Sequence, residues 1–243
     1  SGNNIIAPEF IEGYPFVKPV IDDSLILWLD GTTGNNYEQT GTWKDLSGNG
    51  NDGKLMNFNF TEDSGWVDGG LKFDGVDDYV ECRNINNLTN SSATFEMIVK
   101  PNITGNQVPL ETNLGNRGPH FQTHLRPFGE EWCFGYGYNN GEYFRVYAPV
   151  KNKQLSHIVG VFNKEKKELK LYVDAKVKDT RVIKDDILYS DINTILIGGR
   201  KAFANIEQYV HTVRIYNRAL TDEEIMQNYQ AGQCSPLLAM RGD

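Results

Sequence analysis

Short runs of alternating hydrophobic and polar residues recur along most of the chain. The runs are rich in Val, Ile, Tyr and Phe, and Asn, Gly and Asp clusters separate them at intervals typical of β-sandwiches. A period of two sends successive side chains to opposite faces of a strand. The clearest predicted strands cover residues 25–30, 94–100, 156–163, 169–174, 194–197 and 209–216. The pattern therefore predicts an all-β protein.

One helix is predicted near the C-terminus. Thr221 can cap its first turn while the side chain of Glu224 reaches back, which is a capping box. Ile225 and Tyr229 would then face the core, and Gly232 is expected in the left-handed conformation that ends a helix. Strands and helices do not alternate along the chain, which argues against a parallel α/β sheet.

A tight turn is predicted at Asp174-Ala175, between residues 169–173 and 176–178. In a two-residue hairpin, alanine would have to adopt a left-handed conformation at a cost of about 1–2 kcal/mol. We therefore expect either a longer loop or a tolerated strain at this turn.

Length and composition favour one domain. A chain of 243 residues with 39% hydrophobic content can bury one substantial core. Residues 1–22 contain three prolines and no periodicity, so they are predicted to form a linker or N-terminal arm. We assign residues 23–232 to the folded domain and 233–243 to a C-terminal tail.

Charge, hydropathy and cysteine content exclude several classes of partner and of structural site. The net charge of -8 disfavours nucleic acid as a partner. No run of about 18 apolar residues occurs, so membrane insertion is not expected. Cys82, Cys133 and Cys234 are odd in number and widely spaced, which fits neither a disulfide framework nor a zinc site. We interpret them as free thiols, with a single bridge as the alternative.

Three sequence phrases lie in order across residues 24–231. They are Trp-Lys-Asp-Leu-Ser-Gly-Asn-Gly-Asn-Asp-Gly at 43–53, Phe-Asp-Gly-Val-Asp-Asp-Tyr-Val at 73–80, and Val-Arg-Ile-Tyr-Asn-Arg-Ala-Leu-Thr-Asp-Glu-Glu-Ile at 213–225. Together they resemble the laminin G-like domains of the concanavalin A-like lectin/glucanase superfamily, as found in bacterial surface and bacteriophage tail proteins. The resemblance implies an antiparallel jelly-roll β-sandwich. That superfamily hosts lectins, adhesins, hydrolases and spacers, so the function has to be argued from the site.

The catalytic motifs expected of an enzyme with this architecture are missing. Related glycosidases carry a Glu-x-Asp-x-x-Glu strand that places its carboxylates on one face, and no such segment occurs. Asp77 and Asp78 are adjacent, so on a strand they would point to opposite faces, and we interpret them as turn formers. Neither a Gly-x-Ser-x-Gly elbow nor a His-Glu-x-x-His helix is present. The sequence therefore predicts a protein that is not an enzyme.

Aromatic and polar residues alternate between positions 120 and 147. A strand at 132–138 would send four aromatic side chains to one face, either as half of the core or as a platform for sugar rings. The polar residues of the preceding strand, and those of the following one, suit sugar hydroxyls and carboxylates, although a solvated face needs no ligand. The predicted carbohydrate-binding residues are His120, Gln122, His124, Arg126, Trp132, Tyr136, Tyr138, Tyr143 and Arg145.

The segment 45–52 brings oxygen-bearing side chains together around two glycines. Such a loop can meet the demand of calcium for several oxygen ligands, and Asp30 could add a carboxylate. The alternative is an ordinary Asn-Gly turn without a metal. The predicted ligands of a structural calcium are Asp30, Asp45, Asn49 and Asn51.

These observations predict a non-catalytic carbohydrate-binding module of an extracellular adhesin or phage tail protein. Its partner would be a glycan or cell-surface polysaccharide, its location extracellular, on a cell surface or in a virion, and its context a larger multidomain or multimeric assembly. Two alternatives stay open: a purely structural or protein-binding domain, and a divergent glycoside hydrolase.

Overall fold

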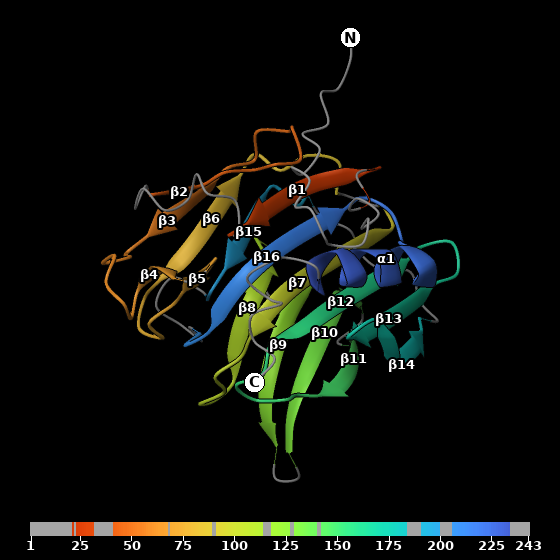
Figure 1. The fold of residues 1–243 in the computed structure, drawn as a ribbon. Helices are drawn as coiled ribbons and strands as arrows, with labels where there is room; N and C mark the ends of the chain where they lie inside the picture. Colours follow the sequence, from red (N-terminus) through yellow and green to blue (C-terminus); the bar gives the residue numbers. More distant parts are fainter. Residues whose placement is uncertain are drawn as a thin grey trace, which may run out of the picture.

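In the computed structural model, two antiparallel β-sheets pack face to face and one helix lies on the outer face of one sheet (Figure 1). We call them sheet A and sheet B. The description covers residues 21, 23–31, 41–67, 69–88, 91–113, 118–126, 129–139, 142–183, 191–199 and 206–233.

Sheet A carries the helix. Its described strands follow the order β14 (Lys176–Val182), β13 (Glu168–Val173), β12 (Ser156–Asn163), β7 (Ala93–Lys100), β16 (Tyr209–Tyr216), β5 (Gly70–Lys72) and β4 (Gly65–Val67). In addition, β1 (Leu25–Asp30) pairs with β16. Strands β1 and β5 use different parts of β16, because residues 212–216 pair with β1 and residues 209–210 with β5.

Sheet B packs against the inner face of sheet A. Its described strands follow the order β11 (Glu142–Pro149), β10 (Gly129–Asn139), β9 (His120–Arg126), β8 (Gln107–Thr112), β15 (Thr194–Ile197), β6 (Tyr79–Arg83), β3 (Gly53–Met56) and β2 (Thr42–Trp43). All six predicted strands are present within one residue of their predicted bounds. The all-β antiparallel sandwich with one C-terminal helix is therefore confirmed.

The core lies between the sheets, where aromatic rings of sheet B pack against the inner face of sheet A. The ring of Phe134 on β10 lies over Gly160 on β12, and a Cβ atom at Gly160 would come within 2.4 Å of that ring. Phe134 also contacts Phe121 of the neighbouring strand, with ring centroids 5.1 Å apart. Gly160 therefore leaves the space that lets the two sheets approach at this point.

Helix α1 (Asp222–Gln233) covers the outer face of sheet A (Figure 1), so the central strands are buried on both faces. A buried charge cluster lies beneath it. Glu96 Oε1 lies 2.6 Å from His157 Nε2 and accepts a hydrogen bond from Arg214 Nη1 at 2.8 Å. Asn228 of the helix donates to Glu96 Oε2 at 3.0 Å. Burial alone would raise the pKa of Glu96, but the Arg214 charge and the His157 hydrogen bond lower it to about 2.

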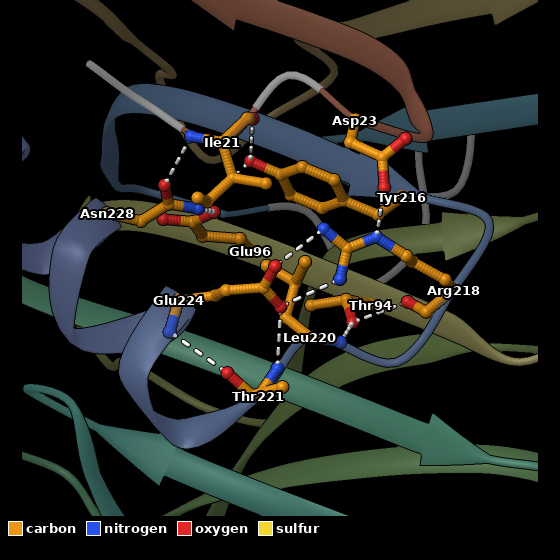
Figure 2. A network of polar contacts seen from close by, with 10 residues as sticks. All are labelled: Ile21, Asp23, Thr94, Glu96, Tyr216, Arg218, Leu220, Thr221, Glu224 and Asn228. Carbon is orange, nitrogen blue, oxygen red and sulfur yellow. Dashed lines mark hydrogen bonds and ion pairs between the residues drawn. The ribbon is translucent and has the colours of Figure 1, made fainter. Parts of the chain in front are cut away.

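Asn228 also connects the start of the described chain to the helix (Figure 2). Its side chain accepts a hydrogen bond from Ile21 N at 3.0 Å and donates to the Tyr216 hydroxyl at 2.9 Å. The Tyr216 hydroxyl in turn donates to Ile21 O at 3.1 Å. Both backbone polar groups of Ile21 are thus held by side chains, one of them on α1.

The helix begins as predicted and ends differently. Glu224 Oε2 accepts from Thr221 N at 2.9 Å and Thr221 Oγ1 accepts from Glu224 N at 3.3 Å, which is the capping box (Figure 2). Gly232 lies inside the helix and does not have a positive φ, so its predicted role as a left-handed terminator is wrong. A Cβ atom at Gly232 would lie 2.8 Å from Ile98 Cδ1, so the glycine lets α1 approach sheet A closely.

The turn between β13 and β14 is a strained two-residue hairpin. Val173 pairs with Lys176, and the two turn residues have φ values of 51° for Asp174 and 56° for Ala175. Of the two predicted outcomes, the tolerated strain is the one observed. The Asp174 carboxylate accepts a hydrogen bond from His157 N at 3.1 Å, which helps to hold this conformation.

Candidate functional site

Two of the predicted sugar-platform residues belong to the core. Trp132 is 0% and Tyr136 2% exposed, and both side chains point toward sheet A. The Tyr136 ring stacks on Phe162 at a centroid distance of 4.2 Å. The prediction that Trp132 and Tyr136 bind carbohydrate is therefore wrong. A wholly aromatic stripe on an internal strand gains more from burial between the sheets than from exposure to water.

A β-bulge interrupts the predicted alternation on β10. The register with β11 shifts between Gly135 and Tyr138, and Gly137 has a φ of 76°. Tyr138 pairs with Tyr143 across the bulge, so the backbone does not continue the period of two from Tyr136. The side chain of Tyr138 lies outside the described residues, as do those of His124 and Arg126 on β9.

Other predicted residues meet on the outer face of sheet B. Gly135 pairs with His120 on one side and Arg145 on the other. Cys133 likewise lies between Gln122 and Tyr147. Alternate residues of each strand enter the core, so this set faces away from sheet A. We define the outer patch as the four predicted residues His120, Gln122, Tyr143 and Arg145 together with Tyr147, which is not in the predicted set and which the register adds.

Strand β11 supplies the half-exposed part of the outer patch. The Arg145 guanidinium lies over the Tyr143 ring, 4.6 Å from its centroid, and the buried Arg145 Nε has no hydrogen-bond partner among the described residues. Tyr147 is also half-buried, and its backbone N–H donates to Asp179 Oδ2 of β14 at 2.9 Å. This bond attaches the edge of sheet B to the edge of sheet A, which fixes the position of β11.

His120 is more enclosed than the sequence predicts. Its side chain is 1% exposed, and its Nδ1 lies 2.8 Å from Gly118 O. A Cβ atom at Gly135 would come within 2.2 Å of the imidazole, so this ring fills the space above the glycine. His120 therefore supports the outer patch from below, whereas Gln122, Tyr143, Arg145 and Tyr147 are only half-buried.

Two carboxylates, those of Glu81 and Glu111, also lie on the outer face of sheet B, and neither belongs to a local sequence motif. Leu196 pairs with Glu111 on one side and Glu81 on the other, so all three face outward. Both acids are buried, and Glu81 Oε2 lies 2.9 Å from Arg83 Nε. Their Cα atoms are two strand spacings apart, about 9–10 Å. No local signal could reveal the pair, because the acids come from β6 and β8 and only the register joins them.

The predicted calcium loop is closed by its own hydrogen bonds. Asp45 Oδ1 accepts from Trp28 N and Ser47 N, and Asp45 Oδ2 accepts from Ser47 Oγ and Asn51 N. The amide groups of Asn49 and Asn51 donate to backbone carbonyls of β1. Both oxygens of Asp45 therefore accept hydrogen bonds within the fold, whereas Asn49 and Asn51 use only their amide nitrogens in these bonds. Calcium at this loop stays a prediction.

A different group of acids could hold a metal. Asp74, Asp77 and Asp78 each offer a carboxylate oxygen within 4.8 Å of the others, and no second such group occurs in the described part of the chain. Asp77 and Asp78 both precede β6 and lie in the turn region before it, as their interpretation as turn formers predicts, so strand alternation does not apply to them.

The described cysteines form no reactive site. Cys82 and Cys133 are buried free thiols, and burial raises the pKa of Cys82. Cys234 lies outside the described residues. Among the described helices, none has the length and apolar character needed to cross a membrane.

Comparison with known proteins identifies a family. The family model for the concanavalin A-like lectin/glucanases superfamily matches residues 74–226. No curated protein sequence matches the chain at a significant level.

Several solved structures share the fold. Botulinum neurotoxin type C, whose cell entry depends on interaction with two ganglioside molecules, superposes with a TM-score of 0.63 at 15% identity over 87% of this chain and 52% of the toxin chain. Trypanosoma rangeli sialidase in complex with sialic acid gives 0.63 at 18% identity, over 96% of this chain and 36% of the sialidase. The binding domain of Paraclostridial Mosquitocidal Protein 1 gives 0.61 at 15% identity, over 88% and 53%. The chain thus spans about half of the toxin structures that it matches.

Proposed function

The chain belongs to the concanavalin A-like lectin/glucanases superfamily, and we propose that it is a non-catalytic carbohydrate-binding module. The observation that carries the proposal is the outer patch on sheet B. It combines aromatic rings, a guanidinium group and an amide on neighbouring strands whose positions the sheet fixes. These are the groups that recognise a saccharide by ring stacking and directional hydrogen bonds.

Arg145 is the central residue of the proposed contact. Its guanidinium lies against Tyr143, and its buried Nε has no hydrogen-bond partner among the described residues. A guanidinium held in one orientation can donate two parallel hydrogen bonds to a sugar carboxylate or to neighbouring hydroxyls. Gln122 and the Tyr147 ring lie on either side of Cys133 and would contact the adjacent part of the sugar.

The similar structures support a glycan as the ligand. The toxin interacts with gangliosides and the sialidase complex contains sialic acid. We infer an extracellular adhesin or phage tail protein as the setting, with this chain as one part of a larger assembly. A shallow patch binds weakly at a single site, so several copies on one particle would provide the affinity.

A glycan array tests the proposal. The wild-type protein is expected to bind a defined set of glycans, and Arg145→Ala and Tyr147→Ala are expected to lose that binding while retaining a folded circular dichroism spectrum. Lys178→Ala, which removes a positive charge from exposed β14 in sheet A, is the matched control and should bind as the wild type does. Binding that survives both patch substitutions, or the absence of any bound glycan, would leave the structural or protein-binding alternative.

The buried pair Glu81 and Glu111 is the observation that bears on the hydrolase alternative. Inverting glycosidases place their two carboxyl groups about 6.5–9.5 Å apart. Our proposal predicts no cleavage when the bound glycan is incubated with the protein and the products are separated by chromatography. Cleavage that disappears in Glu111→Gln would replace the binding proposal by an enzymatic one.

A further inference from the structure

The guanidinium of Arg145 has no counter-charge in the described part of the chain. The other arginines whose side chains the structure describes bond an acid or a backbone carbonyl, and they are Arg83, Arg181, Arg214 and Arg218. The guanidinium of Arg145 lies over the Tyr143 ring, and no hydrogen bond or ion pair joins it to a described residue. Arg145 is half-buried, so its positive charge is only partly hydrated.

The terminal nitrogens of Arg145 are the atoms that a ligand can reach. Its Nε is buried, whereas Nη1 and Nη2 stay accessible to solvent. A guanidinium with this exposure can donate two parallel hydrogen bonds through its terminal nitrogens to a planar group that carries two oxygens. The outer patch therefore presents a charged fork to solvent beside the Tyr143 ring.

The register of sheet B keeps Arg145 away from the acids on the same face. Gly135 and His120 separate Arg145 from Glu111 of β8. Three strand spacings lie between Arg145 and Glu111, which is about 14–15 Å. At that distance two partly exposed charges are largely screened by salt. Glu111 therefore does not neutralise the guanidinium of Arg145.

Strand β14 of sheet A holds β11 on either side of Arg145. The Asp179 carboxylate accepts hydrogen bonds from two backbone amides, one of which is Tyr147 N at 2.9 Å. Arg181 Nη1 donates to Tyr143 O at 3.4 Å. Tyr143 and Tyr147 are each two residues from Arg145, so the strand is fixed on both sides of the guanidinium. A site that is already ordered loses less conformational entropy when it binds a ligand.

We propose that the outer patch binds an acidic saccharide and that Arg145 recognises its carboxylate, an inference that rests on the proposed function. A carboxylate supplies the missing counter-charge, and its two oxygens match the two terminal nitrogens of the guanidinium. The hydroxyl groups of a neutral sugar accept hydrogen bonds but leave the charge of Arg145 uncompensated. Tyr143 and Tyr147 would contact the sugar ring beside the carboxylate.

The acids at the other end of the same row set the direction of the saccharide. Glu111 and Glu81 lie on either side of Leu196 on the outer face of sheet B, and both are buried. Repulsion between like charges disfavours a ligand carboxylate over β8, β15 and β6. The acidic group would therefore bind at β11, and the uncharged part of the saccharide would extend toward β9.

Isothermal titration calorimetry with matched saccharides tests the inference. Sialyllactose is compared with its uncharged methyl ester, and a disaccharide ending in glucuronic acid is compared with the one ending in glucose. In at least one pair the acidic member should bind on the order of tenfold more tightly, and added salt should weaken mainly that member. Arg145→Gln should bind both members alike. Arg145→Lys, which keeps the charge without the planar fork, should retain a reduced preference.

Arg83→Gln is the matched control for the loss of an arginine from this face. Arg83 follows Glu81 by two residues on β6 and pairs with it at 2.9 Å, so its charge already has a partner. The preference for the acidic member should therefore be the same in Arg83→Gln as in the wild type.

Three results would overturn the inference. They are equal binding of both members of each pair by the wild type, a preference that persists in Arg145→Gln, and tighter binding of sulfated lactose than of either acidic saccharide. If the wild type binds only neutral glycans and Arg145→Ala abolishes that binding, the proposed function stands and this inference fails. If the wild type binds no glycan, both fail. The wild-type comparison requires no variant, so it decides even if Arg145→Gln does not fold.

Discussion

Replacing Arg214 by methionine should destabilise the protein strongly at neutral pH. The substitution retains much of the side-chain volume but leaves Glu96, which is 1% exposed, without its guanidinium partner, so that only His157 and Asn228 contact the carboxylate. Breaking a buried ion pair in this way typically costs about 3–5 kcal/mol. In the wild type, the difference between the ordinary Glu96 pKa of 4.5 and about 2 corresponds to on the order of 3 kcal/mol. That shift is a net effect of burial, Arg214, His157 and Asn228, so it does not measure the contribution of Arg214 alone.

The cost should depend on pH in a defined direction. Because Glu96 has a lowered pKa in the folded wild type, its contribution to stability is complete above pH 4.5 and is lost as the pH falls toward 2. In Arg214→Met, burial without the arginine raises the pKa of Glu96, so the folded variant takes up a proton on acidification. The difference in stability between the two proteins should therefore be largest at pH 7 and fall by about half at pH 4.

Urea unfolding at pH 7 and pH 4, followed by tryptophan fluorescence, measures both quantities. Lys72→Met is the matched control, because it breaks the exposed pair of Lys72 with Asp63 at 2.7 Å and should cost about 1 kcal/mol or less. The double variant Glu96→Gln/Arg214→Met should be less destabilised than the sum of the single variants. A cost below about 1 kcal/mol for Arg214→Met, or an equal cost at both pH values, would refute this reasoning.

Three further predictions concern stability. Ala175→Gly should stabilise the protein by about 1 kcal/mol, because glycine adopts the left-handed conformation without strain. Ala148→Gly, at a position with ordinary strand conformation, should instead destabilise it, so the two variants should shift the melting temperature in opposite directions. Tyr136→Ala should cost about 3–5 kcal/mol of unfolding free energy in urea, and a smaller cost than about 1 kcal/mol would contradict its place in the core. Thr221→Ala should cost about 0.5–2 kcal/mol through loss of the capping box, and an unchanged urea midpoint would count against that role.

Local patterns in the sequence are sufficient to predict most of the fold. The period-two runs locate β1, β12, β15 and β16 within a residue, because one or both faces of each strand pack against the core. The Thr221 capping box is also local, since its partners are three residues apart. Gly232 was misread because a glycine near a helix end can serve either as a terminator or as a contact point. Only the position of Ile98 in another strand decides between the two.

The site required information that the sequence does not contain locally. An aromatic stripe such as Trp132 to Tyr136 has the same sequence pattern whether it faces the core or solvent. Its orientation depends on which face of the strand packs against the second sheet. The outer patch depends on the register that aligns Gly135 with His120 and Arg145. The convergence of Asp77 and Asp78 depends on where β6 begins, and element boundaries are the least reliable part of a sequence-based prediction.

The location of glycan binding is the most direct test of the proposed function. Amide chemical shifts should be recorded by nuclear magnetic resonance while a glycan identified on the array is added to the labelled protein. We predict that the largest changes fall on Gln122, Arg145, Tyr147 and their neighbours on β9–β11. Changes confined to α1 and the outer face of sheet A would show that the ligand binds elsewhere, and would contradict the assignment of the outer patch.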